Sequence, residues 1–215
     1  MTGRVVVVDY GIGNVFSVCN ALRTIGADVT LTRAAAEIRG ADRLILPGVG
    51  AFARAMEALD GFGLSDRVRE FVATERPFLG ICVGMQMLMD RSTEFGDHPG
   101  LGLISGAVER LESANDRGER VRVPHIGWSS LSFTDRAADT PLVSAGRDAV
   151  YFVHSYHCKP ADPVNVLATT SYSGLEVTAA IGRDNIVGVQ FHPERSGPVG
   201  RRVLEAFVHD RHRSI

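Results

Sequence analysis

Four consecutive valines, Val5–Val8, constrain the fold of this chain more than any other stretch. An uninterrupted β-branched run is typical of a strand that is buried on both faces, as in a parallel sheet. Apolar residues then recur at helical spacing, which predicts a helix over residues 15–25. Asn14 and Gly26 stand where the two ends of that helix need capping residues. The chain therefore begins with a strand followed by a helix, the repeating unit of α/β folds.

The strand-and-helix pattern repeats as far as residue 82. The expected elements are strands over 27–31, 43–46 and the residues up to 82, with helices over 34–38, from 52 onward, and over 64–74. Consecutive units of this kind predict a twisted parallel sheet with helices on both faces.

From about residue 101 the pattern changes to short alternating stretches. Residues 107–111 and 120–123 flank a polar, glycine-containing segment, which favours an antiparallel hairpin. Further strands are expected over 149–154, 166–170, 177–181 and 186–190, followed by a closing helix over 198–209. The predicted fold class is α/β, with a central, mostly parallel sheet and antiparallel additions in the second half.

Composition narrows the class of protein. With 215 residues and 45% hydrophobic content, the chain is expected to form one domain over residues 1–215. A net charge of -2, with both signs dispersed, argues against a nucleic-acid surface or a membrane patch. Three cysteines without paired spacing argue against a disulfide framework, and no apolar stretch is long enough for a membrane span. We expect a soluble, cytoplasmic protein whose partners are small molecules or another protein.

One cysteine lies at a corner between a buried strand and a helix running into residues 87–89. Gly80 and Gly84 flank Cys82, which lets the backbone bend sharply and keeps other side chains away from the thiol. N–H groups at the start of the following helix would stabilise a thiolate. The alternative is a cysteine that only fills space at a strand end, which is the commoner fate of a lone cysteine. A base elsewhere in the chain decides between the two.

His192 and Glu194 supply that base and its orienting carboxylate. Residues two apart in an extended segment point the same way, so Glu194 can bond one imidazole nitrogen of His192 while the other faces the sulfur. The glycine-rich loop 47–50 follows a central strand and can direct backbone N–H groups at a developing oxyanion. Each feature alone fits an ordinary loop. Together, a nucleophile, a base, an orienter and an oxyanion loop indicate acyl transfer.

Two other groups of residues carry weaker signals. Gly11 and Gly13 suggest a dinucleotide-binding loop, but the third glycine of that fingerprint is missing. A tight strand-to-helix turn is enough to explain them. His154, His157 and Cys158 have no flanking carboxylate, which argues against a metal site.

The segments that carry this chemistry, 80–86 and 189–194, resemble those of the class I glutamine amidotransferases, in which a Cys–His–Glu triad releases ammonia from glutamine. More narrowly, the chain resembles the glutaminase subunits of imidazole glycerol phosphate synthase, which act in histidine biosynthesis. This second resemblance is carried by residues 9–14, 47–50, 123–128, 151–156 and 194–197. Jointly and in this order the motifs are highly specific, and they run through nearly the whole chain.

The resemblance implies a flavodoxin-like three-layer fold, with no metal and no cofactor. It also implies a role for each matching residue. The implied site residues are Cys82 as nucleophile, His192 as base, Glu194 as its orienter, Gly48, Val49 and Gly50 as an oxyanion strand, and Gln86 and Tyr156 as contacts to glutamine. In this family the oxyanion strand becomes organised only when the partner binds, and Val49 is the implied switch residue.

The implied partner is a (β/α)8-barrel cyclase subunit, which forms a heterodimer with the glutaminase. It uses the ammonia to make imidazole glycerol phosphate and an aminoimidazole carboxamide ribotide. Asn14 and Trp128 match motifs at that interface, although Trp128, the only tryptophan, also fits plain core packing. The family usually has asparagine where this chain has the shorter Ser129. Two alternatives remain: a glutaminase that serves another synthase, for pyridoxal phosphate or surface-sugar amidation, and a non-catalytic regulatory protein on the same fold.

Overall fold

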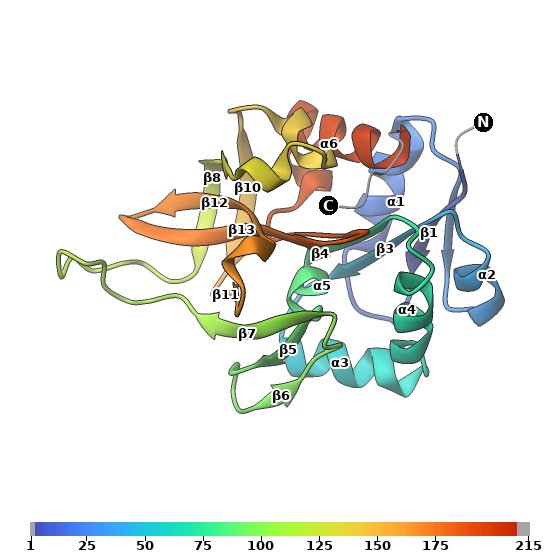
Figure 1. Cartoon of the computed structure of the whole chain (residues 1–215), viewed down its shortest axis with the longest axis horizontal. Coiled ribbons are helices and arrows are strands. Elements are labelled where there is room, and N and C mark those ends of the chain that lie inside the picture. The colour runs from blue at the N-terminus through green and yellow to red at the C-terminus, as the bar shows by residue number, and fades with distance from the viewer. Residues whose placement is uncertain (1–2, 210–215) are drawn as a thin grey trace.

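The computed structural model describes residues 3–209, and a large mixed sheet forms their centre. Within these residues the sheet has eight strands in the order β2-β1-β3-β4-β14-β13-β12-β9 (Figure 1). The strands from β2 to β14 are parallel, and β13, β12 and β9 are added antiparallel. Their bounds are β1 Val5–Val8, β2 Val29–Thr32, β3 Arg43–Gly48, β4 Phe78–Cys82, β9 Ser132–Phe133, β12 Val166–Tyr172, β13 Leu175–Arg183 and β14 Ile186–Val189. The predicted fold class is confirmed.

The register of the central strands brings the predicted site segments to one edge of the sheet. Gly48 at the end of β3 pairs with Cys82 at the end of β4. On the other side of β4, Val189 of β14 pairs with Ile81. Because the three strands are parallel, the segments that leave their carboxyl ends emerge side by side.

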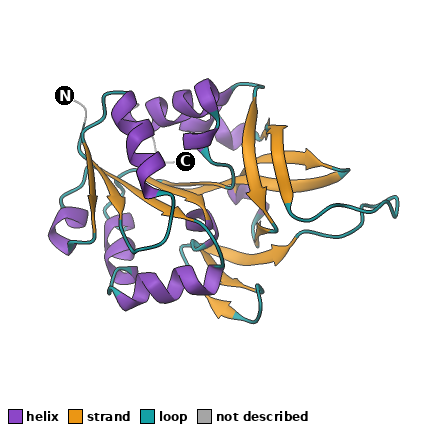
Figure 2. Cartoon of the chain, turned by 180° about the vertical axis from the view of Figure 1, so that it is seen from behind, coloured by secondary structure: helices purple, strands orange, loops and turns teal. Residues whose placement is uncertain are grey.

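Helices cover both faces of this sheet. Helices α1 (Val15–Thr24) and α6 (Gly197–His209) lie on one side, and α2 (Ala35–Arg39), α3 (Phe52–Gly61) and α4 (Ser65–Val72) lie on the other (Figures 1 and 2). The helices predicted over 15–25, 34–38, 64–74 and 198–209 are confirmed, with bounds that differ by one or two residues. Apolar spacing thus located them well.

The second half differs from its prediction in one respect. The predicted hairpin of residues 107–111 with 120–123 is wrong, because β7 (Ile104–Arg110) pairs with β11 (Tyr156–Pro160) and β5 (Met89–Ser92). Residues 120–123 belong to a long loop that extends away from the body of the molecule (Figure 1). The alternating pattern of β7 was real, but its antiparallel partner comes from much later in the chain.

Two smaller sheets complete the fold of the described residues. The strand β6 (His98–Pro99) pairs with β5, and so lies in one sheet with β7 and β11. The strands β8 (His125–Ser130) and β10 (Ala149–His154) form an antiparallel pair. Of these two, β10 was predicted, whereas β8 was noticed only as a motif.

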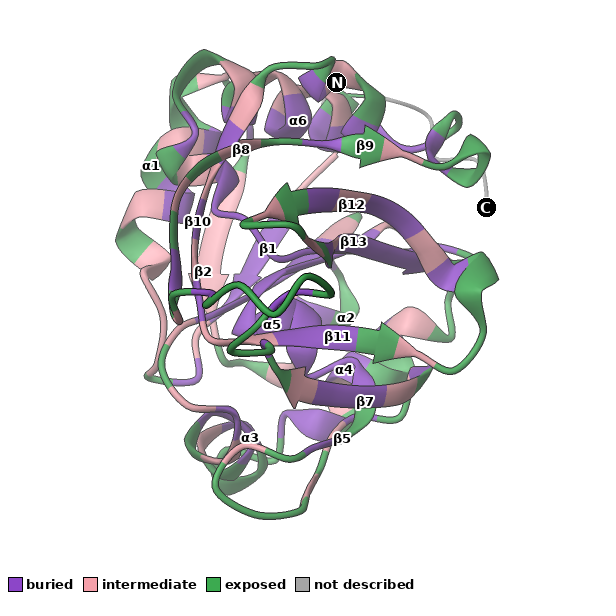
Figure 3. Ribbon diagram, turned by 90° about the vertical axis from the view of Figure 1, so that its left-hand side faces the viewer, coloured by how far each residue is buried: buried purple, intermediate pink, exposed green. Residues whose placement is uncertain are grey.

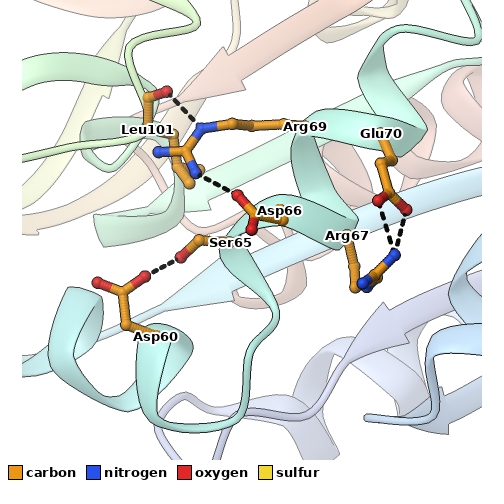
Figure 4. A network of polar contacts seen from close by, with 7 residues as sticks. All are labelled: Asp60, Ser65, Asp66, Arg67, Arg69, Glu70 and Leu101. Carbon is orange, nitrogen blue, oxygen red and sulfur yellow. Dashed lines mark hydrogen bonds and ion pairs between the residues drawn. The ribbon is translucent and has the colours of Figure 1, made fainter.

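A polar network joins α3 to α4 and to the second half (Figure 4). The Ser65 hydroxyl, at the start of α4, donates to the Asp60 carboxylate near the end of α3. Arg69 donates to Asp66 at 3.0 Å and to the Leu101 carbonyl at 3.1 Å. The bond to Leu101 therefore ties α4 to the segment that leads into β7.

The central strands of the large sheet are mostly buried, as the purple ribbon of β1 and β13 shows (Figure 3). Every residue of Val5–Val8 is 0% exposed, which the unbroken valine run predicted. Among the helices of residues 3–209, none combines the length and the apolar character that crossing a membrane requires.

Candidate active site

Cys82 is the last residue of β4 and stands at the corner into α5 (Val83–Gln86). Its φ is 55° and its ψ is −112°. A positive φ at a non-glycine residue is strained and persists only where the surrounding structure imposes it. The helix that follows is a single turn, shorter than predicted, because β5 already begins at Met89.

The flanking glycines serve close packing, which corrects the interpretation that they allow a bend. Neither Gly80 nor Gly84 has a positive φ; the bend falls on Cys82 itself. A Cβ on Gly84 would overlap the Leu46 carbonyl oxygen of β3, and a Cβ on Gly80 would lie 2.8 Å from the Gly84 carbonyl oxygen. The backbone of α5 therefore rests directly on β3 and β4, so the end of β3 lies close to the thiol.

His192 and Glu194 form a buried pair beyond the end of β14. His192 Nδ1 lies 2.8 Å from Glu194 Oε1, and the two side chains are 4% and 1% exposed. A carboxylate accepts, so Nδ1 carries the hydrogen and Nε2 is left for Cys82. Burial alone would lower the pKa of His192, but interactions with Cys82 and Glu194 outweigh burial and raise it to about 10. The site thus stabilises an imidazolium once His192 has taken up a proton.

A cavity of about 420 Å³ opens beside Cys82 and His192. The other predicted site residues that border it are Asn14, Val49, Gly50, Gln86 and Tyr156. Gly48 and Glu194 do not line this cavity, and neither does Trp128. The sequence-based residues therefore gather around one space, with Glu194 behind the imidazole.

The two residues predicted at a partner interface lie in different settings. Asn14 precedes α1, but its side chain makes no capping hydrogen bond, which corrects its expected capping role; it borders the cavity instead. Trp128 is 57% exposed on β8, so the core-packing alternative is wrong. Its ring packs edge-on against Tyr151 at 5.9 Å, and the Arg195 guanidinium lies over the Tyr151 ring at 4.7 Å. Trp128, Tyr151 and Arg195 form what we call the aromatic patch.

Two further residues shape the site without having been singled out from the sequence. Glu94 borders the cavity, and its Oε2 accepts from the backbone N–H of Phe52, at the start of α3, at 2.6 Å. The hydroxyl of Tyr10 donates to the Pro47 carbonyl at 2.8 Å. Tyr10 stands within the 9–14 motif, which was the available signal. For Glu94 only the folded contact between distant segments reveals the position.

Known proteins are similar to this chain in both sequence and topology. The family model for "Glutamine amidotransferase class-I" matches residues 6–211. The chain belongs to the class I glutamine amidotransferases. Its relatives include the imidazole glycerol phosphate synthase subunit HisH of Rhodospirillum rubrum, 45% identical over 95% of this chain and 98% of that protein. The subunit HisH 1 of Legionella pneumophila (strain Lens) is 43% identical over 94% of this chain and 97% of that protein.

Solved structures support the fold of this amidotransferase independently. A structure titled PurLQS from Thermotoga maritima superimposes with a TM-score of 0.72, covering 96% of this chain and 98% of that chain. Because the two chains are only 21% identical in sequence, this similarity supports the fold alone. The resemblance inferred from the motifs is confirmed by the closer sequence relatives.

No metal-binding cluster of three or more His, Cys, Asp or Glu occurs in the part of this amidotransferase that the structure describes. His154 is engaged otherwise, with its Nε2 3.1 Å from His125 Nδ1 and its Nδ1 2.9 Å from the Tyr156 carbonyl. Burial raises the pKa of the Cys158 thiol, so that group stays protonated. These contacts account for the ring of His154, whereas the buried Nδ1 of His157 has no hydrogen-bond partner among the described residues.

The stability of this amidotransferase is expected to fall as the pH drops below 6.5, the ordinary pKa of histidine. Burial lowers the pKa of His125 to about 4 and that of His154 to about 3. The unfolded chain binds these protons below pH 6.5 whereas the folded chain resists them, so acid favours unfolding. Each group costs up to about 1.4 kcal/mol per pH unit in this window.

Urea unfolding followed by Trp128 fluorescence, at neutral pH and at about pH 5, measures this loss. The variant His125→Gln removes one titrating group and should show a shallower decline than the original chain. Parallel declines would contradict the assignment of the effect to His125.

Proposed function

We propose that this chain hydrolyses glutamine to glutamate and ammonia, with Cys82 as nucleophile, His192 as general base and Glu194 as the carboxylate that orients the imidazole. The observation that carries the proposal is the buried His192–Glu194 hydrogen bond of 2.8 Å at the wall of the cavity that also holds Cys82. The thiolate attacks the amide carbon of glutamine, and the proton held by His192 passes to the leaving ammonia. Water then hydrolyses the thioester with His192 again as base.

The cavity wall offers matching groups for the rest of the substrate. Glu94 holds a carboxylate there, which suits the ammonium of glutamine. The amide nitrogen of Gln86 donates to the Tyr156 carbonyl and to Gln190 Oε1, each at 3.0 Å. Because both hydrogens of that nitrogen are used, the Gln86 oxygen is the atom left to accept from the ligand.

We assign the oxyanion strand to residues 48–50. A Cβ on Gly48 would lie 2.6 Å from the Gly84 backbone nitrogen, so this strand and the turn after Cys82 are in close backbone contact. The Tyr10 hydroxyl anchors the Pro47 carbonyl at 2.8 Å. A rotation that aims an N–H at the oxyanion is therefore confined to the peptides after Pro47, where Val49 borders the cavity and Gly50 has φ 83°.

We further propose that the ammonia passes to a (β/α)8-barrel cyclase, which forms a heterodimer with this chain and makes imidazole glycerol phosphate and aminoimidazole carboxamide ribotide in histidine biosynthesis. The relatives are named as subunits of that synthase, which supports such a partner. The aromatic patch suits docking, because Trp128 is exposed while Arg195 reaches from the patch to the cavity. A reducing, cytoplasmic setting fits the free thiols of Cys19, Cys82 and Cys158.

The decisive experiment measures glutamate release by the chain alone and with the cyclase barrel plus its ribonucleotide substrate. We expect weak hydrolysis by the chain alone and a rise of about 100-fold or more in the complex, since one added oxyanion donor has that effect. The barrel without its ribonucleotide is the control for binding alone. Equal rates with and without the barrel would contradict partner-controlled chemistry.

The same experiment separates the alternatives. If another synthase, such as one for pyridoxal phosphate or surface-sugar amidation, restores hydrolysis where the cyclase fails to bind, the chemistry stands and the partner changes. If Cys82 resists a glutamine-like diazoketone in every complex, the chain is a non-catalytic regulatory protein.

A further inference from the structure

Gln190 is wholly buried just before His192 and has no role in the reaction described above. Its exposure is 0%, and its backbone N–H donates to the Ala179 carbonyl of β13 at 2.9 Å, so the sheet fixes its position. Its side-chain nitrogen lies 3.6 Å from Cys82 Sγ. It does not border the substrate cavity. Gln190 therefore touches the nucleophile from inside the protein.

The orientation of the Gln190 amide follows from its neighbours. The Tyr156 carbonyl can only accept, so Gln86, 3.0 Å away, must turn its NH₂ group toward it. The same Gln86 nitrogen lies 3.0 Å from the side-chain amide of Gln190. Because this nitrogen donates, the Gln190 atom that faces it must be the amide oxygen, which accepts. The remaining end of Gln190, its NH₂ group, then faces Cys82.

The Tyr156 carbonyl is itself held from its other side. His154 Nδ1 lies 2.9 Å from it and must donate, so His154 Nε2 accepts from His125 Nδ1 at 3.1 Å. His125 Nε2 in turn accepts from the Ser129 hydroxyl at 3.1 Å. Every hydrogen from Ser129 to Cys82 thus has one position, and the polarity of the chain cannot be reversed without breaking a bond.

We propose that Gln190 is a positioning residue for the nucleophile: its side-chain N–H donates to Cys82 Sγ, stabilises the thiolate and leaves the thiol hydrogen to point at His192. This inference rests on the proposed function of Cys82. The proton moves from Sγ to His192 Nε2, which leaves a thiolate held by Gln190 and an imidazolium held by Glu194. A hydrogen bond to a charged acceptor is about twice as strong as a neutral one, so the contact favours the charged pair.

One short segment after β14 carries three groups that act on the nucleophile or on its base. Residues 190–194 supply the donor to the thiolate, the base and the orienting carboxylate from one stretch of chain. The helix α5, which follows Cys82, has only one turn. The side-chain N–H of Gln190 therefore adds to the stabilisation of the thiolate that the backbone N–H groups of α5 provide.

The variant Gln190→Glu tests this role, because a carboxylate has nearly the same shape but cannot donate when ionised. We expect the rate of Cys82 alkylation by iodoacetamide at neutral pH to fall about ten-fold, and its pH–rate profile to move to higher pH. In the complex with the cyclase, kcat should fall by a similar factor while KM stays near its original value, because Gln190 does not line the cavity.

Asn185→Asp is the matched control. Asn185 is 3% exposed just before β14, and its amide donates to the Val72 and Arg76 carbonyls at 3.0 and 2.7 Å. The same amide-to-carboxylate exchange there should lower stability without changing the alkylation of Cys82. An equal slowing in both variants would assign the effect to general loosening and overturn the proposal.

A second measurement keeps the test independent of how well Gln190 variants fold. This measurement compares the original chain with Cys82→Ala, which both keep Gln190. The side-chain amide protons of Gln190 should have different chemical shifts in the NMR spectra of the two. Unchanged amide protons, or unchanged alkylation in folded Gln190→Glu and Gln190→Met, would overturn the proposal. Alkylation needs no glutamine, so the absence of glutaminase activity in every complex would count against the proposed function without touching this result.

Discussion

Replacing Cys82 by alanine is expected to lower glutamine hydrolysis in the cyclase complex by about 100,000-fold or more, to background. Cys82 carries the one thiol among the described residues that border the cavity, and the hydroxyls of Ser155 and Tyr156, which also border it, cannot form a thioester. Removing the nucleophile from a triad costs about as much as removing the whole triad. Glutamate release with the barrel and its ribonucleotide present measures the loss under conditions where the original chain is fully active.

Cys19→Ala provides the comparison for this result. Cys19 is 1% exposed on α1, so it matches Cys82 in burial and in the atoms removed. We expect it to keep full activity apart from a modest loss of stability. Residual turnover of more than about one part in a thousand in Cys82→Ala would point to a different nucleophile. Retained binding of the barrel would show that the variant is folded.

The first half of the fold was predictable because its signals are local. A valine run that must be buried on both faces, followed by helical spacing of apolar residues, defines a βα unit without reference to distant segments. The observed α1 and α2 lie within one residue of their predicted ends. The right-handedness of the crossovers then limits the orders in which the parallel strands can be arranged.

The second half was harder because its pairings are not local. The strand β7 pairs with β11, and β8 pairs with β10, across loops whose lengths the sequence pattern does not encode. Residues 120–123 alternate like a strand but pair with no strand of the described residues, since the bridge from Ala114 to Arg120 and the backbone hydrogen bonds beside it stay within their own loop. An alternating apolar and polar pattern indicates which side chains share one face of a strand. It does not indicate which other strand pairs with it.

The candidate site was predictable where residue type and chemistry coincide. Cys82 and His192 come together because Cys82 ends β4 and His192 follows β14, two parallel strands that end at the same sheet edge. The contacts of the supporting polar groups were not predictable, because Glu94, Tyr10 and Gln190 bond to segments that are remote in the sequence. The glycines beside Cys82 were noticed for the wrong reason, since a sequence does not distinguish a glycine that bends from one that admits a neighbouring backbone.

Replacing Gly84 by alanine is therefore expected to destabilise the protein by about 3 kcal/mol or more. The new Cβ would overlap the Leu46 carbonyl oxygen, and that oxygen belongs to the backbone of β3 and cannot rotate away. Either β3 or α5 must shift as a unit. Urea unfolding measures the loss of stability, and glutamate release in the cyclase complex measures the loss of function.

Gly61→Ala separates this overlap from the general effect of adding a methyl group. Gly61 ends α3, has no positive φ, and a Cβ there meets nothing within 4 Å, so alanine should be neutral or stabilising by up to about 1 kcal/mol. Because β3 continues into Val49, any shift at Leu46 also displaces the proposed oxyanion strand relative to Cys82. Activity should then fall more steeply than the folded fraction of Gly84→Ala. A variant that loses activity only in proportion to its unfolded fraction would show that the close contact serves stability alone.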